Sequence, residues 1–404
     1  MRNKKSKKFI LTVAFIVLIL SFSFVIAAQN RDITWLSIFE SNSYKIRLGD
    51  EIKKLDKKDN VIALGVNDLK TMLMDHYDSS DVYIDFNDNE HKPDENGMIS
   101  LMIDEESKNP VYNLGQVFFS NNDGLVVNKV QLSIDDRKYL YVMDNRPYSS
   151  VLEGISADIH SRLINRDHTI PENFNDDNIV ALKGVQAILS NKGMKLDKVT
   201  LENLKLMLDK AAEDGVKGFV LSSTYRSYQE QKNLFEFRLN EKKNSGVADP
   251  YEEVSKLVAY PGTSEHQTGM ALDILSINYP KGSTFHNSEE YAWLKENCWE
   301  YGFIPRYPED KVEKTGISFE PWHYRYIGKP LSLYAKETGY CLEEIVESLQ
   351  NNKFTNFKVS DGEEYIFLLL KKDQNFMVES GHNVDFSLFE LTAEDNLVLI
   401  RPGA

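Results

Sequence analysis

Two short segments, far apart in the chain, each carry a histidine with a carboxylate nearby. The first runs from Ser264 to Asp273 and includes His266, and the second runs from Glu320 to His323. Two histidines and one carboxylate leave the fourth position of a four-coordinate zinc ion open, as in catalytic rather than structural zinc sites. We therefore expect a fold that brings His266, Asp273 and His323 around one Zn²⁺ ion.

The residues around these ligands suit hydrolysis. Gly269 and Ala271 allow the backbone to turn and pack tightly between the first two ligands. Zinc lowers the pKa of its bound water, and a carboxylate must then take the proton, which is the role we expect for Glu320. Residues i and i+3 of a regular strand face opposite sides, so we expect a bend at Pro321 between Glu320 and His323.

A third segment, Ser223 to Ser227, contains Arg226, and Gln231 follows it. Amide hydrolysis places negative charge on the carbonyl oxygen in the transition state, which a fixed guanidinium stabilises. Arg226 could instead bind a substrate carboxylate. Each residue taken alone has an ordinary structural role, but together they supply three ligands, a base and an electrophile. The same ligands occur in non-haem iron oxygenases, but the additional Glu320 favours hydrolysis.

The N-terminus predicts a membrane segment. Its basic residues are Arg2, Lys4, Lys5, Lys7 and Lys8. They precede a mainly apolar run from Phe9 to Ala28 of about 20 residues, which as a helix would span roughly 30 Å, the thickness of the hydrocarbon core. Because basic residues keep their side cytoplasmic, we expect a single-pass anchor in the cell membrane and an extracytoplasmic catalytic domain. The alternative is a secreted protein whose signal peptide is cleaved at Val25-Ile26-Ala27.

Charge and cysteine content limit the possible partners. The formal net charge of −15 repels nucleic acid, so we expect no nucleic-acid partner. The two cysteines, Cys298 and Cys341, are too few for a disulfide framework or a four-thiolate metal site. The helical spacing of apolar residues around Cys298 favours a buried free thiol. The sequence leaves a disulfide between the two cysteines open.

The chain of 404 residues is longer than one typical domain. Helical and strand patterns are mixed without a regular βαβ repeat, which predicts an α+β fold. The expected division is a membrane anchor or signal at 1–28, a stalk at 29–59, a β-rich domain at 60–148, a catalytic domain at 149–350 and a small β appendage at 351–404.

Several elements are predicted by residue patterns. Leucine and methionine spacing predicts a helix over 201–212, and a capping box of Ser227 and Glu230 predicts the start of another. A short helix is expected over 69–77 and a hairpin turn at 121–124. The strand-like segments after residue 350 are 365–370, 386–391 and 397–400.

At its chemical segments the chain resembles the VanY-type D-alanyl-D-alanine carboxypeptidases, a group of zinc peptidases. The family's S-x-H-x-x-G-x-A-x-D motif is intact from Ser264 to Asp273, and its E-x-W-H motif is intact from Glu320 to His323. Its S-x-Y-R-S segment is present at 223–227. Flanking segments that also look similar are Leu163–Asp167, Tyr301–Phe303, Arg306–Pro308 and Cys341–Glu344. The resemblance covers residues 160–350, nearly half of the chain.

The resemblance implies a zinc peptidase core with a small antiparallel sheet flanked by helices. The implied zinc ligands are His266, Asp273 and His323, the implied general base is Glu320, and the implied stabiliser of the tetrahedral intermediate is Arg226. The implied substrate contacts are Ser264, Gln231 and Tyr225. The implied activity is attack by zinc-bound water that removes the terminal D-alanine from a peptidoglycan stem pentapeptide.

Other functions are compatible with the same residues. An L,D-carboxypeptidase would cut a tetrapeptide, and a D,D-dipeptidase would cut a free dipeptide whose cytoplasmic location disagrees with the expected anchor. An inactive peptidase fold could bind wall fragments without cleaving them. The sequence also leaves open whether the enzyme serves antibiotic resistance or ordinary wall maintenance, and which oligomeric state it adopts.

Overall fold

The protein is described by a computed structural model over residues 45–48, 51–58, 61–76, 82–86, 93–102, 111–121, 124–134, 139–142, 148–152, 154–174, 176–352, 354–359, 362–379 and 384–401. It divides into two compact units. Of the described residues, those between 45 and 152, those between 374 and 379 and residue 384 belong to the first unit, and those between 154 and 373 and between 385 and 401 belong to the second.

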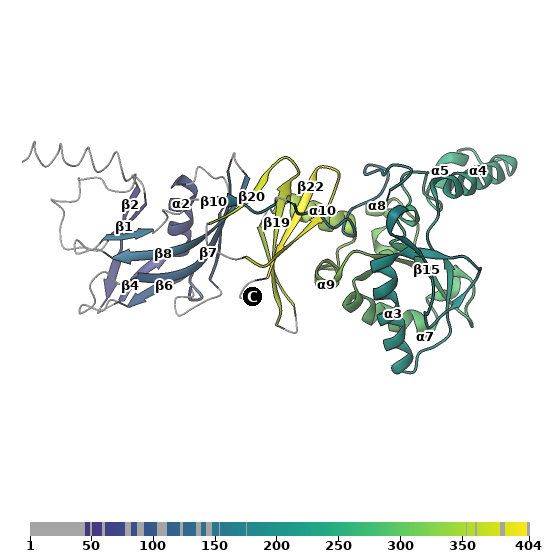
Figure 1. The fold of residues 1–404 in the computed structure, drawn as a ribbon, viewed down its shortest axis with the longest axis horizontal. Coiled ribbons are helices and arrows are strands. Elements are labelled where there is room, and N and C mark those ends of the chain that lie inside the picture. The colour runs from purple at the N-terminus through teal and green to yellow at the C-terminus, as the bar shows by residue number, and fades with distance from the viewer. Residues whose placement is uncertain are drawn as a thin grey trace, which may run out of the picture. The chain divides into compact units, whose positions relative to one another are not determined.

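In the part of the first unit that the structure describes, α2 packs with two β-sheets (Figure 1). Its elements are β1 (Lys45–Leu48), β2 (Glu51–Lys54), β3 (Asp56–Lys58), β4 (Val61–Gly65), α2 (Val66–His76), β5 (Val82–Asp85), β6 (Met98–Met102), β7 (Val111–Asn121), β8 (Gly124–Ile134), β9 (Tyr139–Val142), β10 (Tyr148–Ser150) and β20 (Asn375–Glu379). An eight-stranded sheet has the order β10-β20-β8-β9-β1-β2, with β7 pairing β8 and β5, and a second sheet has the order β3-β4-β6. Leu69, Met72 and Leu73 of α2 are fully buried in the core with residues of both sheets.

The first unit confirms the helix predicted over 69–77 and the hairpin turn predicted at 121–124. α2 covers the former, and Asn121 and Gly124 are paired across the latter. Residues 45–58, which the sequence predicts as part of a stalk, instead form β1, β2 and β3. Ile46 and Leu48 are buried in the same core as α2, which is why this segment folds with the unit.

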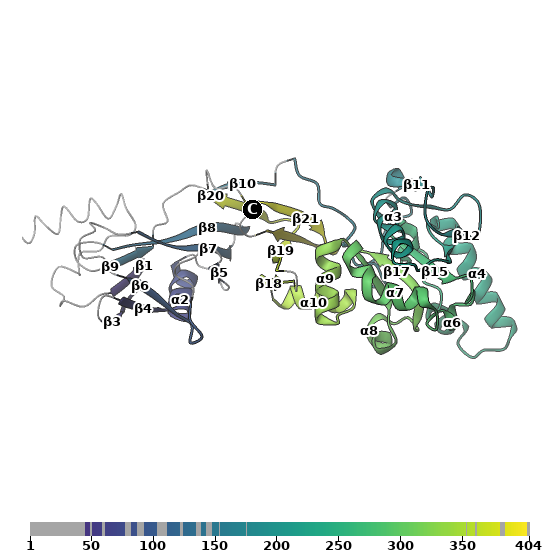
Figure 2. The same ribbon diagram turned by 90° about the horizontal axis from the view of Figure 1, so that it is seen from below.

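A five-stranded sheet forms the centre of the second unit. Its strands are β12 (Ile188–Leu189), β14 (Phe219–Ser223), β15 (Ala271–Ser276), β17 (Glu320–Tyr326) and β16 (Phe303–Tyr307), in that order. All neighbours are antiparallel except β12 and β14. α3 (Lys198–Glu213) and α7 (Glu289–Asn297) lie next to β15 and share one hydrophobic core with it (Figures 1 and 2). This arrangement confirms the predicted α+β class.

Sequence patterns explain how these helices form. Asp197 caps α3 by accepting a hydrogen bond from Thr200 N, and the predicted leucine and methionine stripe of the helix is buried. Ser227 and Glu230 form the predicted capping box at the start of α4 (Tyr228–Asn244). The remaining elements around this sheet are η2 (Asp176–Asn178), β11 (Ile179–Ala181), β13 (Lys195–Asp197), α5 (Pro250–Ser255), η3 (Glu265–Thr268), α6 (Gly282–Phe285), η4 (Cys298–Tyr301), η5 (Glu309–Lys311) and α8 (Val312–Thr315).

A second core in the same unit joins two helices to a four-stranded sheet. The helices are α9 (Lys329–Thr338) and α10 (Leu342–Asn351), and the strands are β18 (Phe354–Lys358), β19 (Glu364–Lys371), β22 (Asp395–Ile400) and β21 (Phe386–Glu390). The three strand-like segments after residue 350 are thereby confirmed. The segment predicted as one appendage is divided, because β20 pairs with β10 and β8 in the first unit.

The predicted single-pass membrane anchor has to be corrected. Among the residues that the structure describes, no helix is both long enough and apolar enough to cross a membrane. The apolar run from Phe9 to Ala28, on which the prediction depended, lies outside the described residues.

Both cysteines are free and buried. Cys298 packs in the core around the five-stranded sheet, as its helical spacing predicts. The disulfide that the sequence left open is therefore not formed.

Candidate metal centre

The first histidine lies in a short turn that leads directly into the central strand. His266 belongs to η3, which ends at Gly269 with a φ of 72°. A Cβ added at Gly269 would lie 2.6 Å from the backbone nitrogen of Asp197, so this close approach requires glycine. β15 starts two residues later and carries Asp273. The tight turn predicted between the first two ligands is confirmed.

The second histidine lies on the neighbouring strand. Asp273 and His323 are direct cross-strand partners in the antiparallel pair of β15 and β17. Asp273 Oδ1 lies 3.2 Å from His323 Nδ1 and 3.4 Å from His266 Nε2. One donor atom from each of these three residues lies within 4.8 Å of the others, so the structure brings the three predicted ligands together.

The donor atoms of this cluster fit a metal ion. Asp273 Oδ1 is buried, and no described residue forms a hydrogen bond with it. Such a buried, unsatisfied carboxylate oxygen is costly unless a cation binds it. Two imidazole nitrogens face the same oxygen, which gives the ligand types and number of a catalytic zinc site.

The other nitrogen of each histidine ring has its own partner. His266 Nδ1 lies 2.8 Å from the carbonyl oxygen of Thr224, to which it donates. His323 Nε2 lies 3.4 Å from Glu265 Oε2. Partners of this kind fix ring orientation and tautomer in metal-binding histidines. The two rings therefore turn different nitrogens, Nε2 of His266 and Nδ1 of His323, toward Asp273.

Charge is concentrated at this cluster. Burial, together with the positive charge of Arg226, lowers the pKa of His266 to about 4, so its ring is neutral at pH 7. Burial opposes ionisation of Asp273, but the two histidines hold the pKa of its carboxyl well below the usual range. Burial opposes protonation of His323, but the neighbouring carboxylates of Asp273 and Glu265 outweigh it and raise the pKa to about 9. The local negative charge that holds this proton also favours a metal cation.

Glu320 lies beside the cluster because β17 is irregular. The pairing of β16 with β17 shifts register between Pro305 and Tyr307, opposite the residues around Pro321. This is the bend that the sequence predicts, and it leaves Glu320 Oε2 3.6 Å from His323 Nδ1. Burial raises the pKa of Glu320 to about 7, and the negative charge of Asp273 acts in the same direction.

Arg226 is held in place by hydrogen bonds to His266 and Gln231. Its backbone nitrogen donates to the carbonyl of His266 at 3.0 Å, and its Nη1 donates to Gln231 Oε1 at 2.6 Å. The amide nitrogen of Gln231 donates in turn to Ala259 O at 2.6 Å. Arg226 Nε is buried, and no described residue accepts a hydrogen bond from it.

The three clustered residues, His266, Asp273 and His323, line a cavity of about 200 Å³, called the metal cavity below. Arg226, Gln231, Ser264 and Glu320 all contribute to its wall, and the Ser264 side chain forms no capping hydrogen bond. Tyr225, a predicted substrate contact, is not among the residues that line this cavity.

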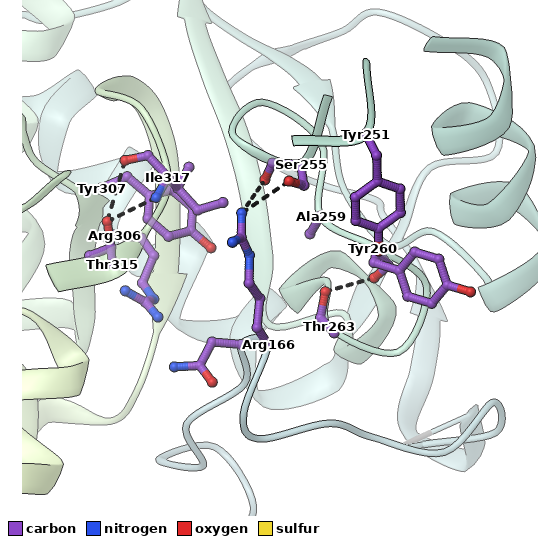
Figure 3. A pocket seen from close by; sticks show the side chains of 11 residues that line it. Arg166, Tyr251, Ser255, Ala259, Tyr260, Thr263, Arg306, Tyr307, Thr315 and Ile317 are labelled. Carbon is purple, nitrogen blue, oxygen red and sulfur yellow. Dashed lines mark hydrogen bonds between the residues drawn. The ribbon is translucent and has the colours of Figure 1, made fainter. Parts of the chain in front are cut away.

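A second pocket of about 100 Å³ adjoins the metal cavity (Figure 3). The two share Ala259, Tyr307 and Ile317. Arg166 points across the pocket in Figure 3, and its Nη2 donates to Ser255 O at 3.3 Å and to Ser255 Oγ at 3.1 Å. The two pockets are therefore neighbours that share part of their walls, and the exposed guanidinium of Arg166 lies in the second one.

Two residues at the site were not predicted. Glu265 contacts His323, and the ring of Tyr307 lies 4.9 Å from the ring of His323 between centroids. Glu265 lies inside the first motif next to His266, and Tyr307 lies in a flanking segment of the resemblance. Their positions in these segments were the only signal that the sequence offered. A role for Glu265 or Tyr307 could be assigned only once the structure showed that both are buried beside His323.

Comparison with known proteins extends the geometric findings. Residues 193–329 match the family model described as "VanY: D-alanyl-D-alanine carboxypeptidase". A D-alanyl-D-alanine carboxypeptidase of Enterococcus faecium is 31% identical over 251 residues, which cover 60% of this chain and 75% of that protein. The bifunctional D-Ala-D-Ala dipeptidase and carboxypeptidase VanXYC of Enterococcus gallinarum is 34% identical over 188 residues, which cover 45% of this chain and 91% of that protein.

A solved structure shows the same fold. The D,D-dipeptidase VanXYg, in complex with a D-Ala-D-Ala phosphinate analogue, aligns with a TM-score of 0.50 and 23% identity. The alignment covers 64% of this chain and 99% of that one.

Proposed function

Because the chain belongs to the VanY family of D-alanyl-D-alanine carboxypeptidases, we propose that it removes the terminal D-alanine from peptidoglycan stem pentapeptides in a zinc-dependent reaction. The observation that carries this proposal is the convergence of His266, Asp273 and His323 in one buried site. Two imidazoles and one carboxylate leave an open coordination position, as hydrolytic zinc requires.

Glu320 is the proposed general base. His266, Asp273 and His323 would hold the zinc ion, which when bound supplies a Lewis acid that acidifies water and polarises the scissile carbonyl. The Glu320 carboxylate accepts a proton from the attacking water and returns it to the amine of the leaving D-alanine. A pKa of about 7 suits a group that must both take and release a proton near neutral pH.

Arg226 is the proposed stabiliser of negative charge on the scissile carbonyl oxygen. Gln231 holds one arm of its guanidinium, and its unpaired Nε can donate to the substrate without a change of rotamer. Ser264 is a proposed second substrate contact, because it lines the cavity and its side chain forms no capping hydrogen bond with η3. Contacts of Gln231 and Tyr225 with substrate stay predictions. Gln231 lines the cavity, but Tyr225 is not among the lining residues, so the cavity gives no support for a contact at Tyr225.

The adjoining pocket supports a peptide substrate longer than a dipeptide. Because it shares Ala259, Tyr307 and Ile317 with the metal cavity, residues upstream of the scissile bond have space to extend toward Arg166. A free D-alanyl-D-alanine dipeptide would leave this space unfilled. The geometry therefore favours a carboxypeptidase over a dipeptidase.

A comparison of three substrates tests the proposal. The purified full-length protein is incubated with zinc and a synthetic stem pentapeptide, the corresponding tetrapeptide, or D-alanyl-D-alanine, and the products are separated by chromatography. We expect D-alanine and tetrapeptide from the pentapeptide, with little further cleavage. Preferential cleavage of the tetrapeptide would indicate an L,D-carboxypeptidase, and preferential cleavage of the dipeptide would indicate a dipeptidase. Binding of the peptides without cleavage would indicate an inactive binding module.

A further inference from the structure

Glu265 is a buried carboxylate that the proposed reaction does not use. Its side chain is fully inaccessible to solvent, and its two oxygens have different partners. Oε1 accepts hydrogen bonds from Arg306 Nε at 2.8 Å and from Arg325 Nη1 at 3.0 Å. Oε2 lies 3.4 Å from His323 Nε2.

Stability alone is a poor explanation for this arrangement. Burial of a carboxylate with two guanidinium groups carries a large desolvation cost, and well-packed apolar residues often stabilise a protein as much or more. The side chains of Glu265, Arg306 and Arg325 are all fully buried. The contact of Glu265 with His323, a proposed metal ligand, suggests that the buried carboxylate acts on the metal centre.

We propose that Glu265 is a positioning residue for the metal centre, which holds His323 in the orientation and tautomer needed for metal binding. A carboxylate that accepts the Nε2 proton of His323 leaves the lone pair on Nδ1, and Nδ1 is the nitrogen that faces Asp273. The inference extends the proposed zinc-dependent function and depends on it.

Comparison with the other histidine, His266, shows why His323 needs a side-chain partner. His266 is oriented by a backbone carbonyl, that of Thr224, which no substitution removes. His323 lies in the middle of irregular strand β17, and its Nε2 faces the side chain of Glu265. The two ligands are thus held by different kinds of partner, and the orientation of His323 is the one open to disruption by substitution.

Arg306 fixes Glu265 from one side. Its Nη1 and Nη2 form a paired interaction with the carboxylate of Glu343 on α10, at 2.8 and 2.6 Å. Asn165 Nδ2 also donates to Glu343, at 3.2 Å. Arg306 therefore has no freedom to rotate away from Glu265 Oε1.

Arg325 fixes Glu265 from the other side. Its Nη2 donates to the backbone carbonyls of His160 at 3.0 Å and Arg162 at 2.9 Å. With both arginines anchored, Oε1 is held in place, and Oε2 lies 3.4 Å from His323 Nε2. Three flanking segments are thereby connected to one proposed ligand of the metal through these contacts: Leu163–Asp167, Arg306–Pro308 and Cys341–Glu344.

A matched pair of variants tests this role. Glu265→Gln and Glu343→Gln each remove one buried carboxylate from Arg306, but Glu265 is the one that contacts His323. Zinc affinity is measured by competition with a chromophoric chelator, and thermal unfolding is measured on the metal-free proteins. We expect Glu265→Gln to lower zinc affinity by about 10- to 100-fold, as for other partners of metal-binding histidines. Glu343→Gln should destabilise the protein to a similar extent and leave zinc affinity near that of the unchanged protein.

Equal zinc affinity in all three proteins, or an equal loss in both variants, would overturn the proposal and leave Glu265 a structural role only. If Glu265→Gln does not fold, the nitrogen signals of histidine in the unchanged, zinc-loaded protein give the answer by NMR. We expect metal on Nδ1 and a retained proton on Nε2 of His323, with the reverse at His266. Metal on Nε2 of His323 would contradict the inference. A protein that binds no zinc would instead contradict the proposed function itself.

Discussion

Asp273 joins the two histidines of the metal centre because its Oδ1 faces one nitrogen of each ring. Residue types and spacing were sufficient to predict this grouping, since two histidines, one aspartate and a nearby glutamate have few joint uses other than metal chemistry. Glu265 was not predictable in the same way. Its role depends on Arg306 and Arg325, which lie far away in sequence, and on burial that no local pattern reveals.

Substitution of Glu320 separates catalysis from metal binding. Glu320→Gln keeps the size of the side chain and removes its ability to accept a proton. Glu320 is not one of the three clustered donor residues, so zinc content should stay unchanged. We expect release of D-alanine to fall by about 10²- to 10⁴-fold, the usual contribution of a general base. Loss of bound zinc together with activity, measured by metal analysis, would show that Glu320 acts as a ligand instead.

Local irregularities in the central sheet bring the site residues together. The turn at Gly269 and the register shift in β17 both occur where a regular element would point a side chain away from the metal. The sequence predicted both places, through a glycine between two ligands and a proline between base and ligand. It did not predict what packs against them, because the neighbour of Gly269 is the backbone at Asp197, seventy-two positions earlier in the sequence.

Two glycines with the same backbone conformation provide a test at this scale. Gly269 has a φ of 72° and would place a Cβ 2.6 Å from a backbone atom, whereas Gly316 has a φ of 70° and nothing within 4 Å. Gly316→Ala should reduce the free energy of unfolding by about 1 kcal/mol, the cost of the left-handed conformation. Gly269→Ala should cost about 1–3 kcal/mol more, because the backbone must move. Equal losses in denaturant titrations would contradict the close packing.

His160 contacts two carboxylates, that of Asp197 at the start of α3 and that of Asp158 two positions earlier in the sequence. Its Nε2 lies 2.8 Å from Asp197 Oδ1, the cap of α3, and its Nδ1 lies 2.5 Å from Asp158 Oδ1. Burial alone would lower the pKa of His160, but the two carboxylates raise it to about 9. The protonated form is therefore favoured in the folded state.

This raised pKa predicts a dependence of stability on pH. The contribution of His160 is fully present below its unfolded pKa of about 6.5 and is lost as pH rises to about 9. With screening of the partly exposed Asp158, it amounts to roughly 2–3 kcal/mol. The difference in unfolding free energy between the unchanged protein and His160→Gln should shrink by this amount between pH 6 and 9. A difference that stays constant would show that His160 is neutral in the folded protein.

At the scale of the whole molecule, strands were predictable but their partners were not. Patterns of apolar residues identified β19, β21 and β22 but not β18 or β20. β20 pairs with β10 and β8, whereas β19 and β22 pack with α10. Pairing between distant strands leaves no local signal in a sequence. This is why the segment after residue 350 was predicted as a single appendage.

Truncation tests whether that segment is dispensable. A chain that ends at Asn351 lacks β20 of the first unit and also β19 and β22, whose Phe367 and Leu399 are fully buried against Leu342 and Ile345 of α10. We expect it to lose its cooperative unfolding transition and its zinc binding, whereas a chain that ends at Arg401 should retain both. A truncated protein with an unchanged transition, measured by circular dichroism, would support an independent appendage.

The most direct test of the central claim is the release of D-alanine from a stem pentapeptide by the full-length protein before chelation, after chelation and after return of zinc. We predict that a chelator abolishes release and that one equivalent of Zn²⁺ restores it. Full activity in the chelated protein, with no metal detected, would contradict a zinc-dependent carboxypeptidase built on His266, Asp273 and His323.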